Sequence, residues 1–257
     1  MTRVLTRTNF HSAQLIRTLA DLSVLETTGP TAAFGEKLGL WIGFTDAIAL
    51  TGVHNTNAVE ETPEAAQPMA GVSLGEEFAK VRASLENTIT KSQAPNTGRT
   101  RAELTLPKLD VPLEDVKAYA PFRRYHQAHQ RDMENNVRSL RAKVRDGVAK
   151  ASPKLRQLTA LDAAFDGILA VQERRLLATI PTLLEKRFNH LRKTHLQTLQ
   201  DTPQTDNNPG LWMMPGAWLA RFCAELQAVL LAELDLRLQP AVGLLEAFHH
   251  DKKLRLI

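Results

Sequence analysis

Long stretches of the second half of the chain place apolar residues every three or four positions, and this period is typical of long helices. Residues 122–151 form the first stretch. Its apolar or seam-compatible positions are His126, Met133, Val137, Leu140, Val144 and Val148. The stripe is close to a heptad seam and is narrow, which predicts a helix about 45 Å long that touches one or two other helices.

Two further periodic stretches follow, and each contains a proline. One runs from Leu158 to Leu191 and is interrupted by Pro181, and the other runs from Ala217 to Phe248 and contains Pro240. An interior proline removes a backbone hydrogen bond, so we expect a kink or break at both positions. The last stretch is apolar over a wide arc, which predicts either the most buried helix or an oligomer interface.

The first half of the chain carries weaker helical signals separated by segments rich in Pro, Asn and Ala. We expect residues 1–53 to form a small helical hairpin. We interpret residues 54–118 as a linker region that contains one short helix over 73–90. Ser73 and Glu76 form a capping-box pattern at the start of this helix. The prediction is an all-α fold in which the hairpin is joined by linkers to a bundle of long amphipathic, partly coiled-coil-like helices over 119–257.

Positive charge is concentrated in the middle of the chain. Residues 119–193 hold 16 Lys and Arg against 7 Asp and Glu, although the whole chain has a net charge of only +4. Such asymmetry indicates an anionic partner. Nucleic acid is the commonest partner of this kind, and a membrane surface or an acidic protein is the next alternative.

Four arginines sharpen this signal, because Arg124, Arg131, Arg138 and Arg145 recur every seven residues. Strict seven-residue spacing predicts one row of guanidinium groups on the solvent side of the helix. We take the nucleic-acid-binding candidates to be Arg123, Arg124, Arg131, Arg138, Arg141, Lys143, Arg145 and Lys150. The alternative is a solvated face that meets the acidic side chains of a partner helix.

The segment before the last periodic stretch combines two indoles with two thioethers. Trp212, Met213, Met214 and Trp218 flank a Pro-Gly pair, and Trp and Met are common in protein interfaces. A cap that packs over the core is the alternative interpretation. The partner-interface candidates are Trp212, Met213, Trp218, Leu226 and Leu230.

The sequence offers no catalytic motif and no metal site. His126 and His129 lack the Glu-x-x-His pattern of di-iron bundles, so we interpret them as a seam histidine and a surface histidine. Cys223 is the only cysteine, which excludes an intrachain disulfide and fits a buried structural thiol in a reducing compartment. Signal-peptide and membrane-spanning patterns are also missing. We therefore expect a cytoplasmic, non-enzymatic protein without cofactor or metal, with a cryptic nuclease as the residual alternative.

Several segments resemble a family of proteobacterial proteins. They are TRTNF and LWIGFTDAIAL near the start, YAPFRRYHQAHQRDME in the middle and WLARFCAELQAVLLAELDLRLQPAVGLLEAF near the end. The family is identified as an accessory component of type III Zorya anti-phage defence systems, where it accompanies a motor-like membrane channel and a peptidoglycan-binding partner. The resemblance implies a cytosolic defence component that works with other subunits and is recruited to an inner-membrane complex.

Two hypotheses follow for the function. In the first, the chain is a helical component of a defence system that binds nucleic acid non-specifically through its basic helix face and assembles with partner subunits. In the second, it is a structural adaptor or oligomeric scaffold that couples to a membrane motor complex without binding nucleic acid.

Overall fold

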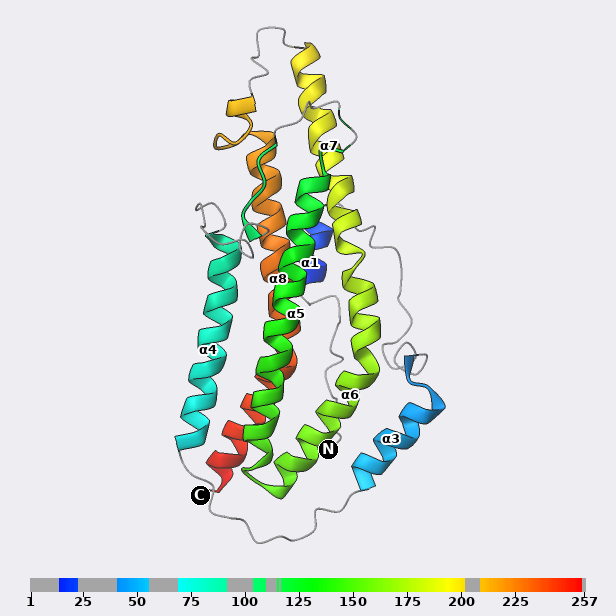
Figure 1. The fold of residues 1–257 in the computed structure, drawn as a ribbon, viewed down its shortest axis with the longest axis vertical. Helices are drawn as coiled ribbons and strands as arrows, with labels where there is room; N and C mark the ends of the chain where they lie inside the picture. The colour runs from blue at the N-terminus through cyan, green and yellow to red at the C-terminus, as the bar shows by residue number, and fades with distance from the viewer. Residues whose placement is uncertain are drawn as a thin grey trace, which may run out of the picture.

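The computed structural model describes residues 14–22, 41–55, 69–91, 104–109, 115, 117–201 and 209–255. These residues form an elongated bundle of helices without a strand, which confirms the predicted all-α fold (Figure 1). The helices are α1 (Gln14–Asp21), α3 (Phe44–Asn55), α4 (Met69–Thr90), α5 (Ala120–Ala149), α6 (Pro153–Leu177), α7 (Ile180–Asp201) and α8 (Trp218–Leu254), with a short 3-10 helix, η3 (Pro209–Leu211), before α8. None of the described helices is both long enough and apolar enough to cross a membrane.

Helix α8 is the axis of the bundle. It is 37 residues long and packs against α1, α4, α5, α6 and α7. Its apolar side chains, such as Leu226, Leu230 and Leu234, are fully buried in one core shared by all these helices. The wide apolar arc of the sequence is therefore explained by several neighbours on different sides.

Helix α5 buries the predicted seam. His126, Met133, Val137, Leu140, Val144 and Val148 are all buried, and the helix packs against α8, α4, α6 and α7, more neighbours than its narrow stripe predicted. At the start of α5, Phe122 packs edge-on against Phe222 of α8, with ring centroids 5.4 Å apart. Phe188 of α7 completes this aromatic contact, because it lies 5.1 Å from Phe222. The aromatic cluster joins α5, α7 and α8 at one end of the core.

The two prolines behave differently. Helix α6 ends at Leu177 and α7 begins at Ile180, so the predicted break occurs and Pro181 lies in the first turn of α7, where a missing N–H costs little. The Tyr119 hydroxyl donates a hydrogen bond of 2.6 Å to the Pro181 carbonyl and fixes this turn to the start of α5. Pro240 lies inside α8, which continues through it as one helix.

The two described N-terminal helices pack against different parts of the bundle. Leu15 and Leu19 of α1 are buried in the main core and pack against α8, whereas α3 lies along α6 on another side of the bundle (Figure 1). The helical hairpin over residues 1–53 stays a prediction, because residues 23–40, which hold the predicted turn and the start of the second helix, lie outside the described residues. The rest of residues 1–53, including the predicted helix start at Asn9, lies outside the described residues.

Helix α4 is also more than a short helix in a linker. It begins at Met69, four residues before the predicted start at Ser73, and it packs against both α5 and α8. Leu85 and Ile89 are buried in the shared core. The remaining parts of the predicted linkers, 56–68, 92–103 and most of 110–116, lie outside the described residues.

Truncating a buried and an exposed leucine of α8 should lower the stability of the protein by different amounts. We expect Leu226→Ala to lower the free energy of unfolding by about 2–5 kcal/mol, because Leu226 is fully buried and the change leaves a cavity. Leu236→Ala, on the exposed side of the same helix, should cost under about 1 kcal/mol. Urea unfolding followed by circular dichroism measures both, and equal losses would contradict the burial of Leu226.

Candidate functional site

Two of the four predicted arginines line an open hollow on α5. Arg124 and Arg131 are exposed, and together with Tyr125 and Gln127 they form one wall. Thr105, Leu106 and Pro107 form the opposite wall of this hollow, which has a volume of about 670 Å³. This part of the basic face is therefore accessible and concave.

Arg145 does not belong to a solvent-facing row. Its Nε donates to Asp162 at 2.5 Å and its Nη2 donates to Asp166 at 2.7 Å, both on α6. Only 17% of its side chain is exposed. Burial of Arg145 lowers the pKa of its guanidinium group. The hydrogen bonds that it donates to Asp166 and Asp162 have a larger combined effect, so the pKa of Arg145 is raised overall.

Arg141 joins the same cluster and is equally removed from solvent. Its Nη2 lies 2.5 Å from Asp162 and its Nη1 lies 2.6 Å from Asp166, with 13% of the side chain exposed. Two arginines of α5 thus hold two aspartates of α6 in a four-membered ion-pair cluster. Paired arginines at this depth act as structural ties between helices.

The helical repeat explains why the predicted row fails at Arg145. A straight α-helix drifts by about 20° for every seven residues relative to a strict 3.5-residue period. Across the three intervals from Arg124 to Arg145 this drift reaches about 60°. The first arginines therefore face solvent, while Arg145 turns toward α6.

The remaining basic candidates differ in how strongly they are held. Arg138 keeps 63% of its side chain exposed and pairs with Glu134, one turn earlier on α5. Lys143 pairs with Glu77 of α4 at 2.7 Å, and Arg123 pairs with Glu185 of α7. Lys150 is exposed at the end of α5. Exposed pairs of this kind contribute under about 1 kcal/mol, so these cations can exchange partners.

A second group of polar residues lies inside the core, between α5, α6 and α8. Glu233 is fully buried and accepts hydrogen bonds of 3.1 Å from Gln130 Nε2 to both carboxylate oxygens. Arg237, one turn later on α8, donates from Nη2 to Glu233 at 2.8 Å and from Nη1 to Glu173 of α6 at 3.2 Å. The negative charge of Glu233 is thus compensated within the core, as buried charges require.

His126 and His129 border this cluster and are both buried, so the prediction of a surface histidine at position 129 is wrong. His129 packs edge-on against the ring of Tyr125, with centroids 4.5 Å apart. His126 Nε2 lies 3.7 Å from Glu233, beyond normal hydrogen-bond distance, and neither of its ring nitrogens has a hydrogen-bond partner within the part of the chain that the structure describes. Among the described residues, no group of side chains has the composition of a metal site.

Burial controls the protonation of this region. Desolvation, followed by repulsion from His129 and Arg237, lowers the pKa of His126 to about 3. Desolvation also lowers the pKa of His129 to about 4, although a hydrogen bond with the backbone of Leu104 acts to raise that pKa. Desolvation raises the pKa of Glu233, although Arg237 and Gln130 oppose the change. Both histidines are therefore neutral at pH 7.

Four of the five predicted partner-interface residues belong to the core instead. Leu226 and Leu230 are fully buried, and Trp212 and Trp218 are also buried, with ring centroids 6.0 Å apart. Only Met213 is exposed, at 43%. The two indoles cover the N-terminal end of α8, where its apolar side chains would otherwise be exposed to water. The thiol of Cys223 is buried, as expected, and burial raises its pKa to about 12.

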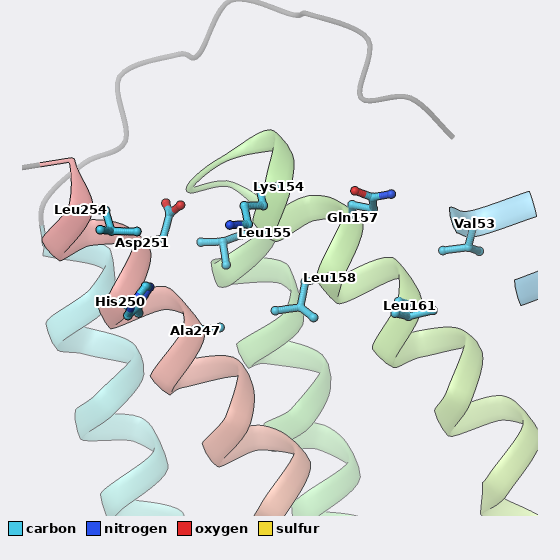
Figure 2. A pocket seen from close by; sticks show the side chains of 10 residues that line it. All are labelled: Val53, Lys154, Leu155, Gln157, Leu158, Leu161, Ala247, His250, Asp251 and Leu254. Carbon is cyan, nitrogen blue, oxygen red and sulfur yellow. The ribbon is translucent and has the colours of Figure 1, made fainter. Parts of the chain in front are cut away.

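A separate apolar hollow lies at the opposite end of the bundle, between α3, α6 and α8. Figure 2 shows Val53 of α3 across from Leu161, and the α8 side chains of Ala247 and His250 across from Leu155 and Leu158. The hollow has a volume of about 360 Å³.

Sequence reasoning missed both the polar core and this hollow. Glu233 and Arg237 follow Leu226 and Leu230 at spacings of three and four, so they continue the buried face of α8. Charged residues at such positions are a signal for a buried ion pair. The hollow has no comparable signal, because it depends on how α3 packs beside α6.

The fold and its sites define an all-α bundle protein with an exposed basic helix face and a charged core. A family model described as "Protein of unknown function (DUF3348)" matches residues 1–250, and the chain belongs to this family. Searches of curated proteins and of solved structures gave no match.

The buried histidines should make stability depend on pH. Because the folded pKa of His126 lies below its unfolded value of about 6.5, its contribution is complete above pH 6.5 and is lost as the pH falls toward 3. We expect His126 to account for about 1 kcal/mol of the loss in unfolding free energy between pH 7.5 and pH 5.5. The raised pKa of Glu233 acts in the opposite direction.

Urea unfolding of His126→Leu at the two pH values measures this share. The loss between pH 7.5 and 5.5 should shrink by about 1 kcal/mol relative to the wild type. His190→Leu, which removes an exposed histidine from α7, is the matched control for the loss of an imidazole from the surface. An identical pH dependence in His126→Leu and the wild type would show that His126 is not buried as a neutral ring.

Proposed function

We propose that this chain is a non-enzymatic, all-α component of a bacterial anti-phage defence system that binds nucleic acid without sequence preference and assembles with partner subunits. The assignment to defence is supported by the resemblance of its terminal and central segments to the accessory component of type III Zorya systems. The proposal includes a cytoplasmic location with recruitment to an inner-membrane complex.

The observation that carries the nucleic-acid proposal is the concave basic wall of Arg124 and Arg131. Seven residues of helix separate the two by about 10 Å along the axis. Both are exposed, and Arg138, seven residues further along α5, is also exposed and pairs with Glu134. A backbone phosphate can replace that exposed pair at little cost.

The expected affinity is modest and depends on salt. Three phosphate contacts correspond to a slope of about −3 in a plot of log affinity against log salt concentration for duplex DNA. Contacts of this kind fix the protein on the backbone and carry no sequence information. Arg141 and Arg145 are excluded from the proposed interface, because Asp162 and Asp166 already hold them.

A structural adaptor is the second candidate, and helix α3 favours it. No side chain of α3 that the structure describes is buried, although the helix is largely apolar. Phe44 is 83% exposed and Ile48 is 57% exposed. Exposed apolar side chains on one helix are typical of a surface that another protein covers. A stable dimer in light scattering, without DNA binding, would favour the adaptor.

Charge reversal on α5 tests the nucleic-acid proposal. The double variant Arg124→Glu and Arg131→Glu should bind a DNA duplex of about 20 base pairs at least about tenfold more weakly at low salt, because two phosphate contacts become repulsive. Fluorescence anisotropy measures the affinity. The charge-matched control is Lys252→Glu with Lys253→Glu, at the exposed end of α8.

The control should retain most of the wild-type affinity, since its lysines are in the last turn of α8, and the end of α8 lies far from the start of α5 (Figure 1). Equal losses in the two variants would mean that binding follows net charge alone and would reject the α5 face. Absence of binding in the wild type would reject the nucleic-acid proposal altogether and leave the adaptor.

A further inference from the structure

The hollow between α3, α6 and α8 has the lining of a binding site for an alkyl chain. Its walls are mainly aliphatic: Val53 from α3, Leu155, Leu158 and Leu161 from α6, and Ala247 and Leu254 from α8. Three helices contribute, and Figure 2 shows their side chains facing one another across the space. A volume of about 360 Å³ falls at the lower end of the range of ligand pockets, about 300–1,000 Å³.

Part of this lining is exposed to water in the isolated chain. Leu158 and Leu254 are among the exposed large apolar residues, whereas Leu155 beside them is buried. Covering the exposed leucines with an apolar group would remove their surfaces from water, and that is the main source of affinity for such a ligand.

The charges at the mouth favour an anionic head group. Lys154 is exposed in the first turn of α6, where the helix dipole adds positive partial charge. His250 is a second nitrogen donor or acceptor on the α8 side. Asp251 is the only carboxylate among the described lining residues, and it pairs with Arg255 at 3.0 Å and is therefore already compensated. The charge left to a ligand is positive.

We propose that this hollow binds a single-chain carboxylate amphiphile, with the alkyl chain between the leucines and the carboxylate beside Lys154. The narrow volume fits one chain, and most of the lining is aliphatic, with the polar side chains of Lys154, Gln157, His250 and Asp251 as the exceptions. The site lies at the end of the bundle where α6 begins and α8 ends, whereas α5 begins toward the other end (Figure 1), and it shares no lining residue with the hollow of Arg124 and Arg131.

A chain-length series tests the apolar part of the site. Isothermal titration of the full chain with hexanoate, octanoate, decanoate and dodecanoate, each below its micelle concentration, should show the affinity rising up to about fourfold for each methylene. The rise should stop once the chain fills the hollow, because further methylenes stay in water. Decyltrimethylammonium, with the opposite charge, should bind at least about fivefold more weakly than decanoate.

Two kinds of variant locate the binding. Lys154→Glu should weaken decanoate by about fivefold or more and remove the preference over the ammonium compound, whereas Lys193→Glu, on an exposed lysine of α7, should change neither. Ala247→Leu fills the hollow and should abolish binding of both compounds. Leu158→Asn alters an exposed side chain and gives a second test if Ala247→Leu does not fold.

Three results would overturn the proposal. The first is equal affinity for decanoate and decyltrimethylammonium in the wild type. The second is unchanged decanoate affinity in Lys154→Glu and Leu158→Asn. The third is binding to phosphatidylglycerol vesicles without saturable binding of any free carboxylate, which would assign the exposed leucines to a membrane surface.

Discussion

The burial of α8 is the constraint on which the rest of the structure depends. A helix of 37 residues with apolar side chains on most of its circumference cannot stay in water, and five other helices pack against it. Its two central charges, Glu233 and Arg237, lie within this buried surface and are compensated by each other, by Gln130 of α5 and by Glu173 of α6. The polar core therefore joins the same helices that the apolar core joins, and breaking it would leave a buried charge unpaired.

The packing around α8 also sorts the positive charges of α5. The side of α5 that faces α6 receives Arg141 and Arg145, which pair with aspartates and become ties within the bundle. The side that faces away from the bundle keeps Arg124 and Arg131 exposed in a concave surface. The excess charge of residues 119–193 therefore divides into arginines that tie α5 to α6 and arginines that are exposed on the surface. The same packing leaves α3 with uncovered apolar side chains at the edge of the bundle.

Periodicity was sufficient to predict the helices of the second half, because burial of one face imposes the same spacing wherever a long helix packs. The seam of α5 and the break before Pro181 follow from that rule. Contacts between distant segments do not leave such a pattern, so the packing of α1 on α8 was not foreseen. The basic face was half predictable: exact heptad spacing suggested four equivalent arginines, but the drift of a straight helix and two aspartates of α6 removed Arg145 from the surface. Leu226 and Leu230 were ambiguous between core and interface, because both environments select the same residues.

The central claim is that the arginines of α5 divide into an exposed set and a structural set. Its most direct test is the salt dependence of DNA binding for the wild type, for Arg124→Gln with Arg131→Gln, and for Arg145→Gln, together with the unfolding free energy of each. The account predicts a slope smaller by about 2 in the double variant, and an unchanged slope with lower stability in Arg145→Gln. A slope reduced in Arg145→Gln but not in the double variant would contradict it.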